Sequence, residues 1–297
     1  MNRRVRTLGI TGLGLFVLIV GAGAALLCEN ALRVPPQLRR GFSLPGSNEV
    51  TVEGSGGIVL SASWLMQRDD CTATVLLFHG VADSRAGVQG QARMLVRDGF
   101  CVLAADSRGH GRSGGDLFTF GVREVDDVRR WVSWVETRHP GRPVYGLGES
   151  MGASILLQAV GAGLPFRAVV AESPFRTFRE VALYRMAQKA PVIGPLLVTP
   201  AFWYARLRYG LDLDQASPLE AMRRIKVPAL IIHGSSDTNI PPDHGRDLAA
   251  AGGACAQFWS VAGGGHTDAI ARQPAEFERR VLAWFNATAP PPGCPRS

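Results

Sequence analysis

The sequence lacks the short motifs that mark most metal and cofactor sites. It contains no C-x-x-C, no H-E-x-x-H, no G-x-x-x-x-G-K-[ST], and no G-x-G-x-x-G after a strand-like run. We therefore expect neither a metal ion nor an organic cofactor. Its 5 cysteines are too few and too irregularly spaced for a disulfide framework. We expect Cys101 to be a buried thiol in a strand. One disulfide among Cys71, Cys255 and Cys294 is possible in an oxidising compartment, and the sequence does not identify the pair.

Long basic runs are absent as well. The formal net charge is +7, but the basic residues are mostly arginines scattered along the chain without interleaved aromatics. This pattern argues against a nucleic-acid partner. A hydrophobic content of 46% over 297 residues is ample for a buried core. Nothing in the composition specifies an oligomeric state.

Charged residues are missing from Thr7 to Cys28. A membrane span needs about 20 apolar residues, whereas the core of a signal peptide needs only about 7–15. Residues 1–30 therefore predict a basic cytoplasmic start followed by an uncleaved single-pass transmembrane anchor. Cleavage after Ala24 is the alternative, and it would give a secreted or periplasmic protein. Three arginines flank the span on each side, but those before it lie closer. Because a first segment with a basic start usually keeps that end in the cytoplasm, we expect the catalytic domain on the extracytoplasmic side of the membrane.

Beyond a proline-containing linker (31–48), the chain predicts one α/β domain over residues 49–288. An entry hairpin is expected first, with strands over 50–53 and 58–66. Apolar strand-like runs, among them 73–78 and 256–261, then alternate with helical patterns. This alternation is typical of a mostly parallel sheet covered by helices on both faces. The interval 173–226 is too long for a simple connection and is rich in aromatic residues, so we expect a helical cap there. The tail 289–297 is expected to be disordered.

The segment Gly148-Glu149-Ser150-Met151-Gly152 lies between a strand-like run and a helix-like run. A G-x-S-x-G nucleophile elbow requires this context, because the serine occupies a strained turn and the flanking glycines let strand and helix approach closely. Ser150 is therefore the candidate nucleophile.

A serine nucleophile needs a histidine base and an orienting acid, which follow it in the order Ser, Asp or Glu, His in hydrolases with this type of sheet. His266 follows the last strand-like run on a glycine-rich loop and is the candidate base, with His244 as the rival, expected to be exposed. Asp237 follows the preceding strand-like run and is the candidate acid. Glu172 is the alternative acid.

The oxyanion formed during acyl transfer needs two backbone N–H donors. Met151 supplies one as the residue after the nucleophile, and Val81 in the loop after the first parallel strand supplies the other.

Five segments in this order resemble the landmarks of the α/β-hydrolase superfamily, most closely its branch similar to serine aminopeptidases and monoacylglycerol lipases, which includes membrane-anchored lipases and acyl-thioesterases. The segments are Leu76-Leu77-Phe78-His79-Gly80, Asp106-Ser107-Arg108-Gly109-His110-Gly111-Arg112-Ser113, Gly148–Gly152, Ile232-His233-Gly234-Ser235-Ser236-Asp237 and Gly265-His266. The resemblance implies the α/β-hydrolase fold, the triad Ser150, Asp237 and His266, and a structural role for the second segment. One departure is Val81-Ala82-Asp83, where some relatives have glycine or a small polar residue.

These features together predict a serine hydrolase that cleaves an ester or thioester through an acyl-serine intermediate. A small-molecule or lipid-derived acyl substrate is favoured, because the expected cap is aromatic and the enzyme would lie at a bilayer. Two alternatives stay open: an aminopeptidase-type amide hydrolase, and a catalytically silent, membrane-tethered interaction module.

Overall fold

The computed structural model describes residues 3–36, 39, 41–66, 71–287 and 289–295, with the side chains of residues 3–17 left out of the description. One sheet holds the described strands in the order β1-β2-β4-β3-β5-β6-β7-β8. The pairings β1 with β2 and β2 with β4 are antiparallel, and the others are parallel. The strands are β1 (Asn48–Glu53), β2 (Val59–Leu65), β3 (Thr74–Phe78), β4 (Cys101–Ala105), β5 (Val144–Glu149), β6 (Ala168–Glu172), β7 (Ala229–Gly234) and β8 (Ala256–Val261).

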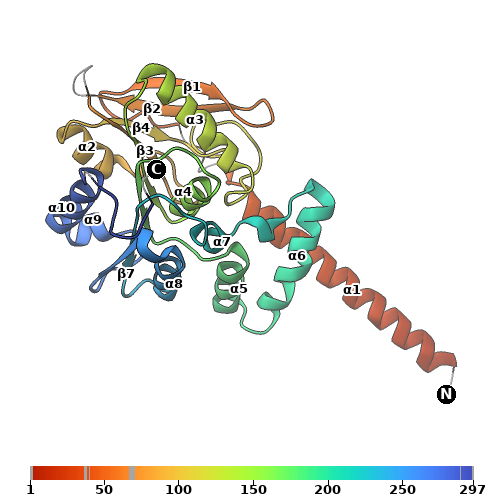
Figure 1. Ribbon diagram of the computed structural model, residues 1–297. Helices are drawn as coiled ribbons and strands as arrows, with labels where there is room; N and C mark the ends of the chain where they lie inside the picture. Colours follow the sequence, from red (N-terminus) through yellow and green to blue (C-terminus); the bar gives the residue numbers. More distant parts are fainter. Residues whose placement is uncertain (1–2, 37–38, 40, 67–70, 288, 296–297) are drawn as a thin grey trace.

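Alternating side chains of each strand enter two separate cores, one on each face of the sheet. In β3, Leu76 and Phe78 join one hydrophobic cluster, and Val75 and Leu77 join the other. Helices α2, α9 and α10 cover the face of Val75, while α3 and α4 lie on the opposite side (Figure 1). The helices of the sheet layers are α2 (Gln89–Arg97), α3 (Glu124–Arg138), α4 (Met151–Gly161), α8 (Asp243–Gly252), the 3-10 helix η3 (Gly253–Cys255), α9 (Ala269–Arg272) and α10 (Pro274–Phe285).

The interval 173–226, which was expected to form a helical cap, folds into helices. Helices α5 and α6 pack against each other beside the sheet, and the shorter α7 packs on α4 (Figure 1). Thr177 caps α5 by accepting a hydrogen bond from the Glu180 N–H, and Gly210 ends α6 with φ +65°. The cap elements are α5 (Phe178–Lys189), α6 (Ile193–Tyr209), the 3-10 helix η2 (Leu213–Gln215) and α7 (Pro218–Met222).

The N-terminal segment forms one helix, α1 (Arg3–Leu32). Its C-terminal part lies beside α6, and its N-terminal part extends away from the body of the molecule (Figure 1). Within the part of the chain that the structure describes, no helix has both the length and the apolar character needed to cross a bilayer. The predicted span up to residue 17 lies outside the residues whose side chains are described. The segment after α1 differs from the expected linker, because Val34 and Leu44 are buried and therefore belong to the two cores.

The cysteines form two disulfides, Cys71–Cys101 and Cys255–Cys294. The second fits the bridge that the sequence left open, whereas the expectation of a free thiol at Cys101 is wrong. Sequence spacing could not reveal the first bridge, since the two residues meet only where β4 pairs with β3. The second bridge also fastens the tail expected to be disordered, because residue 294 is tied to the end of η3.

Candidate active site

Ser150 occupies the sharp turn between β5 and α4, with φ +51° and ψ −111°. A Cβ atom on Gly148 would lie 2.6 Å from the Ala153 nitrogen, and one on Gly152 would lie 2.6 Å from the Phe78 carbonyl carbon. Only glycine at these two positions lets the helix start so close to the strands. The Ser150 N–H donates to the Glu172 carbonyl at 2.8 Å, which ties the turn to β6. The local geometry is that of the predicted nucleophile elbow.

The structure brings Ser150, Asp237 and His266 together at the carboxyl ends of the parallel strands. His266 Nε2 lies 2.9 Å from Ser150 Oγ, and His266 Nδ1 lies 2.7 Å from Asp237 Oδ2. With the carboxylate accepting from Nδ1–H, the neutral ring leaves Nε2 free to accept the serine proton. The loops after β7 and β8 meet closely because Gly234 has no side chain: a Cβ there would lie 2.6 Å from the Gly264 carbonyl carbon.

Asp237 accepts three hydrogen bonds and has a second histidine close by. Its Oδ1 accepts from the backbone N–H groups of Asn239 at 2.8 Å and Ile240 at 3.0 Å. Its Oδ2 accepts from His266 and lies 3.4 Å from His233 Nε2. Burial alone raises the pKa of Asp237, but the hydrogen bonds from His233 and His266 outweigh burial, so its pKa lies well below the usual range. The Asp237 side chain is therefore charged at ordinary pH.

His233 is the residue that sequence reasoning missed. Chain order removes it as a base, but the structure places its fully buried ring beside the candidate acid, where Nε2 also donates to the Ile240 carbonyl at 2.9 Å. The available signal was its position at the end of β7, four residues before Asp237.

The two alternative residues have other partners. His244 was expected to be exposed, which is wrong: it is buried, and its Nδ1 accepts from the Arg176 N–H at 3.0 Å. Burial lowers the pKa of His244 to about 4, so the ring is neutral at ordinary pH. Glu172 is also buried, and its Oε1 accepts from the Ala269 N–H at 2.9 Å. Burial raises its pKa to about 7, which does not suit a residue that must stay charged beside the base.

The loop after β3, which carries the second candidate oxyanion donor, lies beside Ser150. A Cβ atom on Gly80 would lie 3.6 Å from the Ser150 Cβ, so the backbone at Gly80 and Val81 runs directly beside the serine. Among the described residues, neither the Val81 N–H nor the Met151 N–H has a backbone hydrogen-bond partner. Both amides therefore stay candidates for the two oxyanion donors.

Two buried histidines hold this loop in place. The Ala82 N–H donates to His110 Nε2 at 3.2 Å, and His110 Nδ1 donates to the Arg108 carbonyl at 2.9 Å. The His79 ring lies 5.1 Å from the His110 ring and accepts from the Ser107 N–H at 3.0 Å. Burial lowers the pKa of His110 to about 3 and lowers that of His79 as well. Both rings are neutral supports of the loop and take no part in proton transfer.

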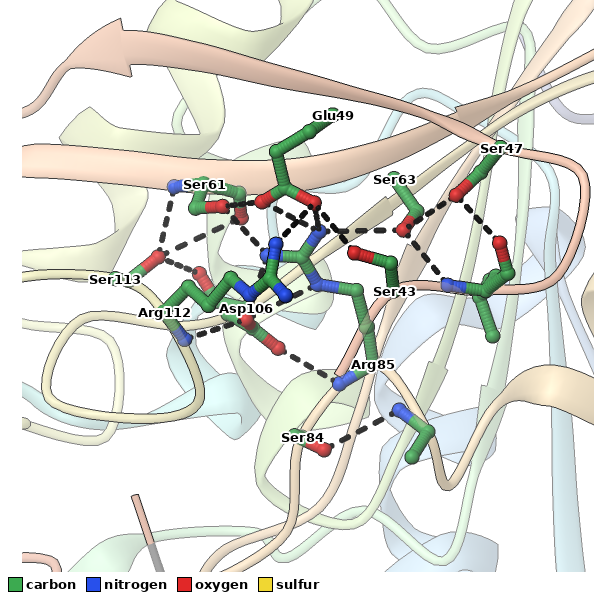
Figure 2. A network of polar contacts seen from close by, with 12 residues as sticks. Ser43, Ser47, Glu49, Ser61, Ser63, Ser84, Arg85, Asp106, Arg112 and Ser113 are labelled. Carbon is green, nitrogen blue, oxygen red and sulfur yellow. Dashed lines mark hydrogen bonds and ion pairs between the residues drawn. The ribbon is translucent and has the colours of Figure 1, made fainter. Parts of the chain in front are cut away.

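A buried ion pair fixes the other end of the same loop. The Arg85 guanidinium and the Asp106 carboxylate are both fully buried, and Arg85 Nη2 lies 2.7 Å from Asp106 Oδ2. The Arg85 N–H donates to Asp106 Oδ1 at 2.8 Å, and the guanidinium also reaches Glu49 on β1 at 3.0 Å (Figure 2). The segment from residue 106 onwards, which the resemblance treats as structural, thus joins the oxyanion loop to the entry hairpin.

A cavity of about 660 Å³ opens over Ser150 and His266. Its lining is mostly apolar and comes from the loop after β4, from α5 and α6, and from the last turns of α1. The volume is in the range of about 300–1,000 Å³ that suits a drug-sized organic ligand.

Comparisons with known proteins agree with this geometry. A family model described as serine aminopeptidase, S33, matches residues 69–202. The protein YqkD of Bacillus subtilis is 32% identical over 175 residues, which are 58% of this chain and 57% of that protein. A monoacylglycerol lipase of Mycolicibacterium smegmatis is 34% identical over 115 residues, which are 37% of this chain and 40% of that protein. The chain thus spans well under two thirds of the length of these relatives.

Solved structures show the same fold. The esterase Pf2001 of Pyrococcus furiosus superposes with a TM-score of 0.67 at 23% identity, over 80% of this chain and 91% of that one. The chain has the α/β-hydrolase fold, and its N-terminal helix lies before the residues that the family model matches.

Proposed function

We propose that this α/β hydrolase is a serine esterase acting on lipid-derived carboxylic esters or thioesters. The supporting observation is the pair of contacts at His266, with Ser150 Oγ 2.9 Å from Nε2 and Asp237 Oδ2 2.7 Å from Nδ1, beneath a mostly apolar cavity. A base within hydrogen-bond reach of a serine hydroxyl, itself oriented by a buried carboxylate, is the arrangement that activates serine for acyl transfer.

The reaction proceeds in two halves. Ser150 Oγ attacks the carbonyl carbon of the ester while its proton passes to His266 Nε2, and the N–H groups of Val81 and Met151 stabilise the oxyanion. Collapse of the tetrahedral intermediate breaks the carbon–oxygen or carbon–sulfur bond, and His266 protonates the leaving group. Water then attacks the acyl-serine with His266 again acting as base, which releases the acid and restores the serine. Asp237 keeps its charge and stabilises the imidazolium throughout.

The cavity lining supports an apolar acyl group as the substrate. Phenylalanines from the loop after β4 and from the cap surround the space above the nucleophile. Several relatives that match shorter segments are monoglyceride or monoacylglycerol lipases by name, which agrees with an ester of this kind. A purified preparation is expected to hydrolyse p-nitrophenyl esters and to leave aminoacyl-arylamides intact. The reverse preference would favour the aminopeptidase alternative.

Fluorophosphonate labelling separates an enzyme from a silent module. The wild-type protein is expected to be labelled, and Ser150→Ala is expected to lose both labelling and turnover with its circular-dichroism spectrum unchanged. Equal turnover in both proteins would remove Ser150 from the mechanism.

We also propose that α1 anchors the enzyme in a membrane, with the catalytic domain on the extracytoplasmic side. The uncharged segment Thr7–Cys28 and the exposed side chains Leu18, Ile19 and Leu26 support the anchor. The two disulfides support an oxidising compartment. The full chain is expected to stay in the pellet after carbonate washing and to be digested by protease added outside intact spheroplasts. Release by carbonate would contradict the anchor, and protection from protease would contradict the orientation.

A further inference from the structure

The last two turns of α1 form part of the cavity over the nucleophile. Leu27, Ala31 and Leu32 line the same space as Ser150 and His266. The family-model match begins at residue 69, so this side of the cavity lies outside the matched part of the chain. The substrate space of this protein is therefore completed by a helix that the family match does not include.

This part of α1 is held firmly against the body. Ala24, Cys28 and Leu32 form one buried helical face, with exposed fractions of 1%, 2% and 0%. The Leu32 carbonyl accepts from the Phe118 N–H at 3.0 Å, which joins the end of the helix to the loop after β4. The wall is thus a packed part of the core.

Polar contacts join α1 to the cap as well. Glu29 Oε1 accepts from the Tyr204 hydroxyl at 3.1 Å and also from the Tyr209 hydroxyl, both on α6. Arg33 donates to the same Tyr209 hydroxyl at 3.2 Å and to Glu29 at 2.8 Å. Because Glu29 is bonded to α6 and to Arg33 at once, α1 and α6 form one unit on this side of the cavity.

The space between this unit and the nucleophile is apolar. Phe118, Phe178 and Phe202 line it together with Leu27, Ala31 and Leu32. The charged side chains Arg33, Asp83, Arg185 and Lys189 also border the cavity, but all four lie at least partly in solvent. Glu149 borders it as well and is buried, and burial raises its pKa to about 9, so this side chain is uncharged at neutral pH. A lining of this kind binds hydrocarbon by removing apolar surface from water and contributes little to the binding of a polar head group.

We propose that Leu27, Ala31 and Leu32 of α1 form a wall of the acyl-chain site, and that Ala31 limits the length of the acyl chain accepted. The ligand class is a carboxylic ester with an apolar acyl chain, whose carbonyl carbon lies beside Ser150 Oγ. This assignment rests on the proposed function, since it requires Ser150 to act on esters.

The test compares Ala31→Trp with Ala22→Trp in the full chain in detergent micelles. Ala31 lines the cavity, whereas Ala22 lies on the exposed side of the same helix and does not line it. We measure kcat/KM for p-nitrophenyl esters from acetate to laurate. Ala31→Trp is expected to lower kcat/KM for laurate by about tenfold or more relative to kcat/KM for acetate, when both are compared with wild type. Ala22→Trp is expected to match wild type at every chain length.

Equal chain-length profiles for the two tryptophan variants would overturn the proposal while leaving the esterase function intact. If Ala31→Trp loses acetate hydrolysis too, the smaller change Ala31→Leu decides: a larger loss on laurate than on acetate supports the wall, and equal losses overturn it. Absence of ester hydrolysis in the wild-type protein would refute the proposed function, and the assignment of the acyl site with it.

Discussion

The Asp237→Asn substitution separates the charge of the candidate acid from its geometry. An asparagine can keep its carbonyl oxygen on the N–H groups of Asn239 and Ile240, now at 2.8 and 3.0 Å from Asp237 Oδ1. Its amide nitrogen then faces His266 Nδ1 in place of Oδ2. Since an NH₂ group only donates, Nδ1 must accept, and the neutral ring carries its proton on Nε2.

That tautomer cannot accept the proton of Ser150, whose Oγ lies 2.9 Å from Nε2. The corresponding change in chymotrypsin-type proteases lowers kcat about 10⁴-fold, or about 5 kcal/mol of transition-state stabilisation, and we expect a loss of that order here. The acid dependence of stability should change as well. Because the pKa of Asp237 is lower in the native state than in the unfolded chain, where it is about 4, the carboxylate stabilises the native state above pH 4. This contribution is lost as the pH falls below 4. The asparagine variant lacks it at every pH.

The assay is steady-state hydrolysis of a short p-nitrophenyl ester at pH 8, with Glu172→Gln as the matched control. Glu172 ends the neighbouring strand and is the alternative acid, and glutamine can still accept from the Ala269 N–H at its carbonyl oxygen. We expect the control to keep activity within about tenfold of wild type, since Glu172 makes no contact with the base. The assignment of Asp237 as the acid would be refuted if Glu172→Gln lost as much activity as Asp237→Asn. It would also be refuted if Asp237→Asn kept more than a tenth of wild-type activity.

Three further predictions concern stability. Arg85→Met should lower the free energy of unfolding by about 3–5 kcal/mol, because it leaves the Asp106 carboxylate buried without its partner; an unchanged urea midpoint would contradict this. Burial raises the pKa of Glu149 to about 9, so the native state keeps a proton that the unfolded chain releases near pH 4.5, and stability falls as the pH rises between these values. The Tm of Glu149→Gln should therefore fall less than the Tm of wild type between pH 5 and pH 9. Equal changes of Tm with pH in the two proteins would contradict the raised pKa of Glu149. Cys294→Ser should cost about 2–4 kcal/mol by freeing the tail from Cys255, measured by urea unfolding without reductant, where an equal midpoint would show that the bridge contributes nothing.

Much of the fold follows from local pattern. Strand β3 was expected over 73–78 and is Thr74–Phe78, and β8 was expected over the same residues that it occupies, Ala256–Val261. Strands buried on both faces read as short apolar runs, and glycine-rich turns end them, so their positions are encoded within a few neighbouring residues. The elbow at Ser150 is encoded in the same way.

Contacts between distant segments were not predictable in this way. The Cys71–Cys101 bridge depends on the pairing of β3 with β4, and the burial of His244 depends on its contact with the start of the cap. The position of His233 beside Asp237 depends on the turn that follows β7. None of these leaves a periodic signal, because each joins residues whose separation in sequence is set by the topology.

The sequence by itself determined the order of strands and helices and the candidate nucleophile, base and acid, since these depend on residue type, chain order and local spacing. The tertiary structure decided which histidine reaches Ser150, how Asp237 keeps its charge, and that α1 closes one side of the cavity. The physical reason is that a proton-transfer distance and a cavity wall exist only when separate segments of the chain are packed together, and packing is a property of the whole fold.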